Sequence, residues 1–565
     1  MSGRALRMTL GAAAGAVERR RAAFAAERFG ARLLAHDDAL WGSDPAHRKV
    51  AANRLGWLDA PRVVGARAAE LMGFAAEVAG DGFTHAVLLG MGGSSLAPEV
   101  LRRTFGVAPG RLDLTVLDNT SPAAVRAVTQ AHDPQRTMFV VASKSGGTLE
   151  VTSFERHFWE WSRAARGDAA GRAFVAITDP GTSLGDLARA RGYRRTFENP
   201  PDIGGRYSVL SCFGLLPAAL IGADVAGLLA AGASERATLE GECDALALGA
   251  GLGELARAGR DKLTLVLGPA LAWLGPWIEQ LVAESTGKSG RGIVPVAEEP
   301  LASPDRYADD RVFVAVGSPG LSPADEAALE KLAQAGHPVL RWSSSASDEL
   351  GADFMRWEIA TAAAGAVLEV DPFDEPNVAE AKAATQAVLK GFLESGALPE
   401  PAAAAQDGGL AAYAPARQGA PGRTAEDWLA AFVALARPGD YLALLAYLEA
   451  TPERLRALQS LRLALRDRTR RATTLGIGPR FLHSTGQLHK GGANNGVFLQ
   501  ITADEGDLPI PGERYGFGVL RAAQAAGDYE VLERRGRRVL RIHLGSDPDA
   551  GLAALARALG EPARR

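Results

Sequence analysis

The sequence predicts an α/β fold in which parallel sheets are flanked by helices. Short apolar runs alternate with longer segments of helical periodicity along most of the chain, which is the pattern of parallel α/β architecture. The apolar runs are nearly continuous, as expected for strands that are buried on both faces. A chain of 565 residues is also long enough for two to four domains with cores of their own.

The first series of expected strands begins at residue 85. It comprises His85–Gly90, Leu112–Asp118, Thr137–Ser143 and Ala173–Asp179. A stretch of helical character follows each strand, over Ser95–Phe105, Pro122–Ala131, Leu149–Ala165 and Ser183–Arg191. We therefore expect a first α/β domain over residues 61–240, preceded by a helical arm over residues 1–60.

A second series of the same type predicts another α/β domain, over residues 241–398. Its strands are expected over Lys262–Gly268, Arg311–Gly317 and His337–Trp342. Residues 399–424 are rich in Ala, Pro and Gly without a clear period, which is typical of a linker. Beyond them, an amphipathic helix over Pro452–Arg470 and the strand-like segments NGVFLQIT and RVLRIHLG predict a C-terminal α/β region over residues 425–565.

Composition excludes several classes of protein. The net charge of −4, without a basic stripe, argues against a nucleic-acid partner. The only cysteines, Cys212 and Cys243, are too few for a disulfide framework or a zinc cage, so a reducing cytoplasm fits best. The chain has neither a signal peptide nor a run of about 18 apolar residues, so we expect no membrane association.

The first strand runs directly into GMGGSSLAPEV, which contains Gly93 and Ser94. A glycine-rich turn that opens a helix after a parallel strand gathers backbone N–H groups at the positive helix end. The spacing is not GxGxxG and no acidic residue follows at a ribose-binding distance, so a dinucleotide site is weakly supported. Taken alone, an ordinary tight turn is the simpler interpretation.

The third strand ends in SKSGGTLE, which resembles an oxyanion cradle in its chemistry. Ser143, Ser145 and Thr148 offer hydroxyls and Lys144 offers a charge, all at the start of a helix. The plain alternative is a helix N-cap by Thr148, with Glu150 in the first turn. Three hydroxyls and a lysine exceed what a cap needs, which favours a monophosphate, and the spacing is not that of a nucleotide-binding P-loop.

Two further stretches carry charged groups in unusual settings. In DIGGRYSVLSCFG, Arg206 follows Gly204 and Gly205, so a permanent cation points at a place where a ligand can approach the backbone. In WIEQLVAESTGK, Glu284 closes an apolar helix and Gln280 lies four residues earlier on the same face. A carboxylate at a helix C-terminus tends to have a raised pKa, which suits a general base, although a solvated glutamate is the commoner case.

Together these stretches resemble the glucose-6-phosphate isomerase (phosphoglucose isomerase) family, which is built from two sugar-isomerase (SIS) α/β domains. GMGGSSLAPE resembles its first glycine loop, SKSGGTLE its phosphate loop, GGRYSVLSCFGL its most specific signature and AESTGK its catalytic glutamate segment. DPFDEPNVAEAK resembles the segment that carries the family's lysine, and HSTGQ the segment that carries its histidine. The resemblance spans residues 90–487.

The chain departs from the common family pattern in the order of these segments. His483 follows Lys382 instead of preceding it, which resembles the isomerase half of the bifunctional transaldolase/glucose-6-phosphate isomerase proteins. No transaldolase half is expected here. Glu375 stands where the family usually has Gln, and Ser145 replaces a threonine of the phosphate loop. His489 and Lys490 are rivals of His483 and Lys382, because they lie in the same glycine-rich segment.

The resemblance implies reversible isomerisation of glucose 6-phosphate and fructose 6-phosphate through a cis-enediol(ate). Glu284 would be the base that moves a proton between C1 and C2, and Arg206 would stabilise the negative oxygen. His483 would open the sugar ring with Lys382 beside it. The substrate and its phosphate would be held by Gly93, Ser94, Ser143, Lys144, Ser145, Thr148, Gly205 and Gln280. No metal or organic cofactor is implied.

Two alternatives stay open, as does the assembly. One is an isomerase of other or dual sugar specificity that also accepts mannose 6-phosphate, and the other is a non-catalytic SIS protein that senses a sugar phosphate. Family members commonly form homodimers that borrow the histidine from the neighbouring subunit. The later position of His483 in this chain leaves room for a site made by one chain.

Overall fold

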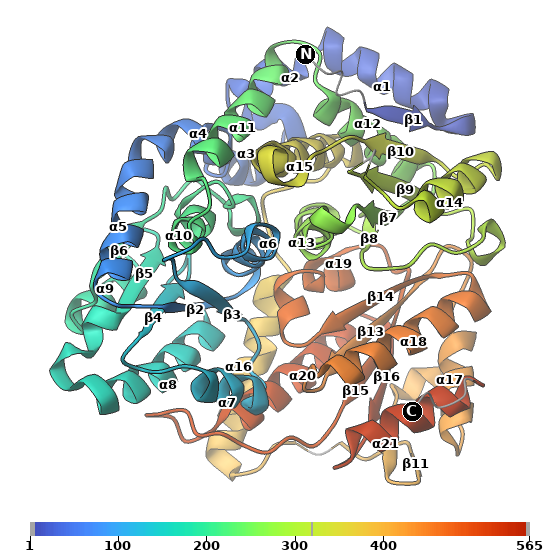
Figure 1. Cartoon of the computed structure of the whole chain (residues 1–565). Helices are drawn as coiled ribbons and strands as arrows, with labels where there is room; N and C mark the ends of the chain where they lie inside the picture. The colour runs from blue at the N-terminus through green and yellow to red at the C-terminus, as the bar shows by residue number, and fades with distance from the viewer. Residues whose placement is uncertain (1–5, 318–319, 400, 561–565) are drawn as a thin grey trace.

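The computed structural model describes residues 6–317, 320–399 and 401–560, and within them the chain forms three sheets flanked by helices (Figure 1). The predicted α/β class with parallel sheets is therefore confirmed. None of the described helices is both long and apolar enough to cross a bilayer.

The first sheet has the strand order β3-β2-β4-β5-β6, and its strands are all parallel. Four strands lie within one residue of the expected bounds at each end: β2 (His85–Gly90), β3 (Asp113–Leu117), β4 (Thr137–Ala142) and β5 (Phe174–Thr178). Their crossovers contain the expected helices α6 (Leu96–Phe105), α7 (Pro122–Ala131), α8 (Leu149–Arg166) and α9 (Ser183–Ala190). The short edge strand β6 (Arg195–Glu198) was not predicted, because its charged residues do not form an apolar run.

The second sheet has the order β1-β10-β9-β7-β8. Its parallel strands are β7 (Lys262–Leu267), β8 (Val294–Val296), β9 (Arg311–Val316) and β10 (Val339–Trp342). Strand β10 begins two residues later than expected, directly after Pro338, which has no N–H to donate to a neighbouring strand. The helices of this part are α12 (Asp244–Arg257), α13 (Leu274–Thr286), α14 (Pro323–Gln334) and α15 (Ala346–Leu368).

The N-terminal arm is not purely helical. It contains α1 (Ala14–Ala26), α2 (Phe29–Leu34), α3 (Pro45–Ala52) and α4 (Ala60–Val63), before α5 (Ala68–Gly80) leads into the first sheet. However, β1 (Arg7–Thr9) pairs antiparallel with β10 and forms the edge of the second sheet. A three-residue strand is too short to show a period of its own, so only its pairing partner defines it.

The third sheet has the order β11-β12-β16-β15-β13-β14. Strands β13 (Tyr441–Tyr447), β14 (Ala472–Ile477), β15 (Gly496–Thr502) and β16 (Arg538–His543) are parallel. The helices around them are α16 (Val378–Ser395), α17 (Ala425–Ala434), α18 (Pro452–Thr469), α19 (Gly486–Gly491), α20 (Phe517–Arg534) and α21 (Pro548–Ala558). Helix α18 and strands β15 and β16 lie where the sequence predicted them.

The expectation that residues 399–424 are irregular is wrong for two segments. Strands β11 (Ala405–Asp407) and β12 (Leu410–Tyr413) form a hairpin, and β12 pairs antiparallel with β16. The turn is Gly408–Gly409, where both residues have positive φ and therefore favour glycine. The strand sequences AQD and LAAY are too short to show a strand period of their own, so pairing with β16 defines them. The domain boundaries themselves remain predictions.

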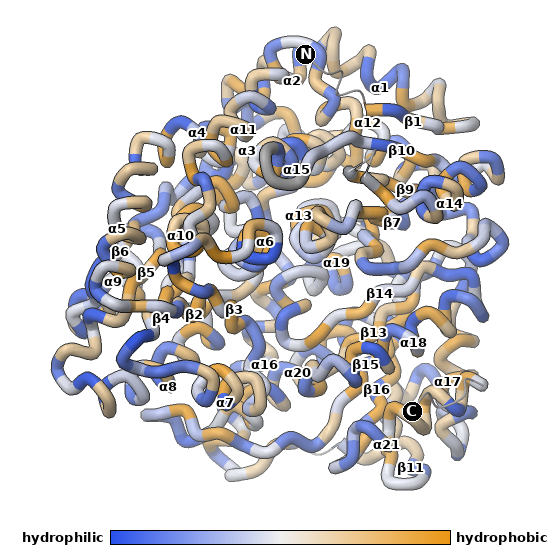
Figure 2. The backbone as a smooth tube through the Cα atoms, viewed as in Figure 1, coloured by the Kyte–Doolittle hydropathy of each residue, from blue (hydrophilic) through white to orange (hydrophobic). Residues whose placement is uncertain are grey.

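Helices α6, α10 (Cys212–Ile221), α13 and α19 gather at the centre of the molecule, where the three sheets converge (Figure 1). The strands behind them are largely apolar along their length (Figure 2). One hydrophobic cluster includes Phe139 of the first sheet and Leu274 and Trp357 of the second part. Another joins Ala283 of α13 to Leu488 of α19. The C-terminal region is therefore packed against α13 and is not a loosely tethered appendage.

Candidate active site

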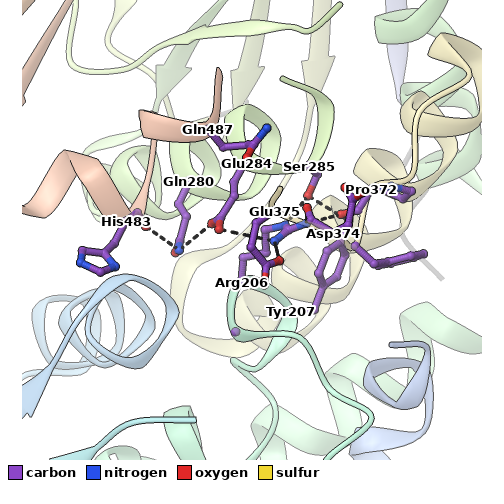
Figure 3. Close-up of polar contacts among 12 residues, drawn as sticks. Arg206, Tyr207, Gln280, Glu284, Ser285, Pro372, Asp374, Glu375, His483 and Gln487 are labelled. Atoms are coloured by element: carbon purple, nitrogen blue, oxygen red, sulfur yellow. Dashed lines mark hydrogen bonds and ion pairs between the residues drawn. The ribbon is translucent and has the colours of Figure 1, made fainter. Parts of the chain in front are cut away.

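Glu284 and Arg206 meet at this centre (Figure 3). Glu284 lies in the last turn of α13, and Arg206 lies in a one-turn helix, Gly205–Tyr207, that precedes α10. Arg206 Nη1 is 3.5 Å from Glu284 Oε1, and both side chains are buried. The two stretches that the sequence singled out for a cation and a carboxylate therefore form one site.

The Arg206 guanidinium is fixed by protein oxygens on every nitrogen. Its Nε donates to Ser285 Oγ at 2.8 Å, and its Nη2 donates to the carbonyl oxygens of Pro372 at 2.7 Å and Asp374 at 2.9 Å. Its Nη1 donates to Glu375 Oε2 at 3.0 Å. Burial opposes the charge, but the adjacent carboxylates outweigh it and raise the pKa of Arg206, so this cation is permanent.

The two carboxylates beside Arg206 differ in environment. Burial has the largest effect on Glu284 and raises its pKa, whereas the charge of Arg206 lowers it. The negative charge of Glu375 adds to the effect of burial, so the pKa of Glu284 is raised overall. Glu375 is more exposed, and although partial burial opposes it, Arg206 holds the pKa of Glu375 below its usual value. Environments that push two pKa values apart are typical of acid–base sites.

Gln280 connects the glutamate to the histidine segment. Its Nε2 donates to Glu284 Oε2 at 3.1 Å and to the backbone oxygen of His483 at 2.8 Å (Figure 3). Gly92, which has a φ of +57°, lies directly against this bridge, because a Cβ there would be 2.9 Å from both Gln280 Nε2 and the His483 oxygen. Only glycine fits at this close approach.

Gly93 and Ser94 pack against the arginine loop. A Cβ at Gly93 would overlap the carbonyl oxygen of Gly205, so the two glycine-rich loops meet backbone to backbone. Ser94 is buried in the one-turn helix Gly92–Ser94, which also contains Gly93. The tight packing gives these glycines a structural reason, and contact of Gly93, Ser94 and Gly205 with a ligand remains a prediction.

His483 faces the first sheet through a carboxylate that the sequence interpretation missed. Its Nε2 is 2.8 Å from Oε1 of Glu150, which lies in the first turn of α8. Gln524 of α20 also donates to Glu150 Oε1, at 2.7 Å. Burial would raise the pKa of Glu150, but His483 and, more weakly, Lys382 outweigh burial and lower it. An acidic residue in a first helical turn is common, so sequence position alone did not distinguish Glu150.

Lys382 lies on α16 and lines a small cavity at the same place. The other residues around this cavity include Gly147, Thr148, Glu150 and His483. Lys382 thus lies near both the histidine and the end of the phosphate loop.

His489 and Lys490, the alternatives to His483 and Lys382, are buried in the core of the C-terminal region. His489 is buried among the rings of Tyr441, Phe481 and Phe498, and burial lowers its pKa well below the usual value. Lys490 Nζ donates to Asp528 Oδ1 at 2.6 Å, and both side chains are fully buried. The geometry therefore favours His483 and Lys382 as the residues that belong to the site.

The phosphate loop presents its hydroxyls at the start of α8. Ser143 Oγ lies 3.0 Å from Thr148 Oγ1, and Ser145 Oγ accepts a long bond of 3.5 Å from the N–H of Gly147. Thr148 makes no capping hydrogen bond to α8, so the N-cap alternative is not supported. Lys144 is ion-paired with Asp179 and donates to Pro201, so its charge is shared with the protein.

Two further residues hold the motifs together. Lys288 Nζ donates to the carbonyl oxygen and to Oδ1 of Asp374, both at 2.6 Å, and burial is the main cause that lowers the pKa of Lys288 to about 8. Gln487 accepts from Asn377 N at 2.8 Å and donates to the Gly287 oxygen at 3.0 Å. The segments that carry the glutamate, the lysine and the histidine are thereby joined. The described residues contain no group of three or more metal-ligating side chains.

Comparison with known proteins identifies the family. A family model described as phosphoglucose isomerase matches residues 69–289. The glucose-6-phosphate isomerase of Rubrobacter xylanophilus is 31% identical over 365 residues, which cover 55% of this chain and 84% of that relative. The chain belongs to the glucose-6-phosphate isomerase family. Membership also supports the two SIS-type domains that the resemblance implied.

Other members of the family match a shorter part of the chain. The glucose-6-phosphate isomerase of Thermus thermophilus is 34% identical over 233 residues, which cover 40% of this chain and 55% of that relative. A solved structure of the hypothetical protein TT0462 from the same species has a TM-score of 0.58 and 27% identity, and covers 68% of this chain and 100% of that chain. The family model ends at residue 289, so the placement of His483 and Lys382 rests on the geometry described above.

Proposed function

We propose that this chain interconverts glucose 6-phosphate and fructose 6-phosphate by moving one proton between C1 and C2 of the open-chain sugar. The observation that carries the proposal is the buried contact of 3.5 Å between Glu284 and Arg206. Isomerisation of this kind needs a base for a weak carbon acid and a cation for the oxygen that becomes negative. The two side chains are matched to these needs.

Glu284 acts as the base. A carboxylate whose pKa is raised toward the working pH is a better proton acceptor than an ordinary exposed glutamate. Gln280 holds one of its oxygens at 3.1 Å and so limits the directions in which the carboxylate points. The same carboxyl group returns the proton to the neighbouring carbon, which gives the reaction its reversibility.

Arg206 stabilises the enediolate oxygen. Since carbonyl oxygens and Ser285 already hold three of its donor positions, the guanidinium needs little reorganisation when negative charge develops. Its Nη1 lies between Glu284 and Glu375 and is the nitrogen that faces the reacting carboxylate.

His483 opens the sugar ring, with Glu150 and Lys382 lining the same small cavity. Because the lowered pKa keeps Glu150 ionised, the hydrogen of the contact lies on His483 Nε2. An imidazole held in this way gives and takes a proton at its other nitrogen.

The phosphate binds at the start of α8. Ser143, Ser145 and Thr148 supply hydroxyls there, and the helix N-terminus adds its positive end. Gly93, Ser94, Gly205 and Gln280 complete the substrate-binding set. Lys144 also belongs to this set, but its ammonium is paired with Asp179, so it offers the phosphate less charge than a free lysine would. Buried, unpaired Cys212 and Cys243 support work in the reducing cytoplasm.

The test is turnover of fructose 6-phosphate by the purified protein and by Glu284→Gln. We expect the variant to lose at least about 10²-fold in kcat while it still binds the substrate. Equal turnover by both proteins would remove Glu284 from its role. A wild-type protein that binds hexose 6-phosphates but turns over neither fructose 6-phosphate nor mannose 6-phosphate would be a sensor and not an isomerase.

A further inference from the structure

Gln524 makes a hydrogen bond to the site from the C-terminal region. Its Nε2 donates to Glu150 Oε1 at 2.7 Å, the same oxygen that lies 2.8 Å from His483 Nε2. All three groups come from different parts of the chain: α8, the one-turn helix Arg480–His483 and α20. Gln524 and Glu150 are both buried, so water does not replace this bond easily.

The amide of Gln524 has one allowed orientation. Its Oε1 accepts from Thr120 Oγ1 at 2.9 Å, just beyond the carboxyl end of β3. A flipped amide would place Oε1 against the Glu150 carboxylate, and two acceptors at that distance repel each other. The ionised Glu150 therefore selects the orientation in which the NH₂ group faces the carboxylate, and the Thr120 hydroxyl donates to the oxygen on the other side of the amide.

The helix that carries Gln524 is itself fixed to the first sheet. Phe517 in the first turn of α20 stacks on Phe154 of α8, with ring centroids 5.8 Å apart and an interplanar angle of 16°. The same two helices thus contact each other at a ring pair and at the Gln524–Glu150 bond. The ring contact fixes α20 relative to α8, and the hydrogen bond then fixes the Glu150 carboxylate relative to Gln524.

We infer that Gln524 is a positioning residue for ring opening: it holds the Glu150 carboxylate ionised and oriented toward His483. The inference deepens the proposed function and rests on it. A hydrogen bond donated to a carboxylate favours its charged form, and one fixed carboxylate oxygen restricts the imidazole that contacts it. The C-terminal region then supplies both the histidine and the group that orients it.

The pH dependence follows from the groups around this contact. Glu150 contacts His483 and interacts electrostatically with Lys382 of α16. Tyr447 of β13 in turn interacts electrostatically with Glu150. Asp118, directly after β3, also interacts electrostatically with His483 and pairs with Arg480. Removal of the Gln524 donor raises the pKa of Glu150, so this carboxylate is protonated at a higher pH. The acid limb of the kcat profile, to which Glu284 and Glu150 both contribute, then moves to higher pH.

The experiment compares Gln524→Met with Gln524→Glu in fructose 6-phosphate turnover across pH. Gln524→Met keeps the approximate shape and removes the donor, and we expect kcat to fall about tenfold with little change in KM and an acid limb at higher pH. In Gln524→Glu the introduced carboxyl lies beside Glu150. That variant should recover activity as pH falls, when the pair holds one proton and a donor is restored.

Gln500→Met is the matched control. Gln500 is a buried glutamine of β15 whose amide donates to the backbone oxygen of Ala525, next to Gln524, and to Asp528 instead of to Glu150. It tests the effect of a lost buried amide in the same region, and its pH profile should be that of the wild type. Thr120→Val is a second variant, for use if Gln524→Met does not fold. It removes the hydroxyl that donates to Gln524, and it should shift the acid limb in the same direction as Gln524→Met, but by less.

The titration of the Glu150 carboxyl, followed by nuclear magnetic resonance, separates this inference from the proposed function. We expect Gln524→Met to raise the pKa of Glu150 and to change the chemical shifts of the His483 ring, whether or not the protein turns over the sugar. An unchanged Glu150 titration and an unchanged pH profile in folded Gln524→Met would overturn the inference. An inactive wild type, together with a changed Glu150 titration in Gln524→Met, would overturn only the proposed function.

Discussion

Glu284 and Glu375 share one nitrogen of a single arginine. Nη1 of Arg206 lies 3.0 Å from Glu375 Oε2 and 3.5 Å from Glu284 Oε1, while the other nitrogens are held by Ser285 and backbone carbonyls. Glu375 stands where the resemblance led us to expect glutamine. The site therefore contains a second carboxylate that competes with the base for the same cation.

This competition predicts the effect of Glu375→Gln. The charge of Glu375 contributes to the raised pKa of Glu284. When that charge is removed, Glu284 becomes the only carboxylate that pairs with Arg206 among the residues that the structure describes. Both effects lower the pKa of the base, so it remains deprotonated to lower pH. We expect the acid limb of kcat/KM to move down by about one pH unit.

The measurement is the pH profile of kcat/KM for fructose 6-phosphate. Glu380→Gln is the control, because Glu380 is a carboxylate of α16 that pairs with Arg535 and accepts from Asn377 instead of pairing with Arg206. If Glu375→Gln moved the acid limb of the profile to higher pH, Glu375 would not be raising the pKa of Glu284 and would not be competing with it for Arg206.

Gly93→Ala is expected to damage both stability and activity. A Cβ at this position would overlap the Gly205 carbonyl oxygen, so the two glycine-rich loops would have to move apart and displace Arg206. We expect a loss of about 1–3 kcal/mol in the free energy of unfolding and a fall in kcat. Chemical denaturation and steady-state kinetics measure the two effects.

Gly73→Ala serves as the control for Gly93→Ala. Gly73 lies in α5, and a Cβ there would meet nothing within 4 Å. Alanine is the better helix former, so this variant should be as stable as the wild type or slightly more so. If Gly93→Ala proved equally harmless, the loops would not be in the contact described.

Lys288 makes stability depend on pH in the alkaline range. Its pKa is lowered to about 8 in the folded protein from an ordinary value of 10.5. Between these values the unfolded chain keeps a proton that the folded chain has lost, so stability should rise with pH relative to Lys288→Met. Over the pH range from about 8 to 10.5, this gain in the free energy of unfolding amounts to about 3 kcal/mol.

Denaturation of wild type and Lys288→Met at several pH values between about 7 and 10.5 tests this linkage. Taking the difference between the two proteins cancels the groups that they share. A difference that stays constant across this range would mean that Lys288 keeps its ordinary pKa in the folded state.

A site made by one chain predicts activity that is independent of dilution. His483 reaches Glu150 of its own chain at 2.8 Å, and Glu284 reaches Arg206 of its own chain at 3.5 Å. Specific activity should therefore stay constant from micromolar to nanomolar protein, while size-exclusion chromatography follows the assembly. Activity that falls in step with dissociation would show that a second subunit contributes to the site.

Local pattern was enough to predict the sheets and the main charged residues. The runs of β2, β4, β7 and β9 were recognised because a strand that is buried on both faces is mostly apolar. Arg206 was recognised because a glycine pair is a local feature, and Glu284 because its segment AESTGK resembles the catalytic segment of the family. Strand β1 and the β11–β12 hairpin were missed because their strength comes from partners far along the chain.

By itself the sequence determined the fold class, the family and the chemical groups available at each motif, since these depend on residue type and short spacing. Only the tertiary structure decided which groups meet: His483 and Glu150 are 333 residues apart, and Gln524 and Glu150 are 374 apart. It also separated His483 from buried His489, and Lys382 from the Lys490–Asp528 pair. Side-chain contacts of this kind depend on how the three sheets pack around α13, and no local period encodes that packing.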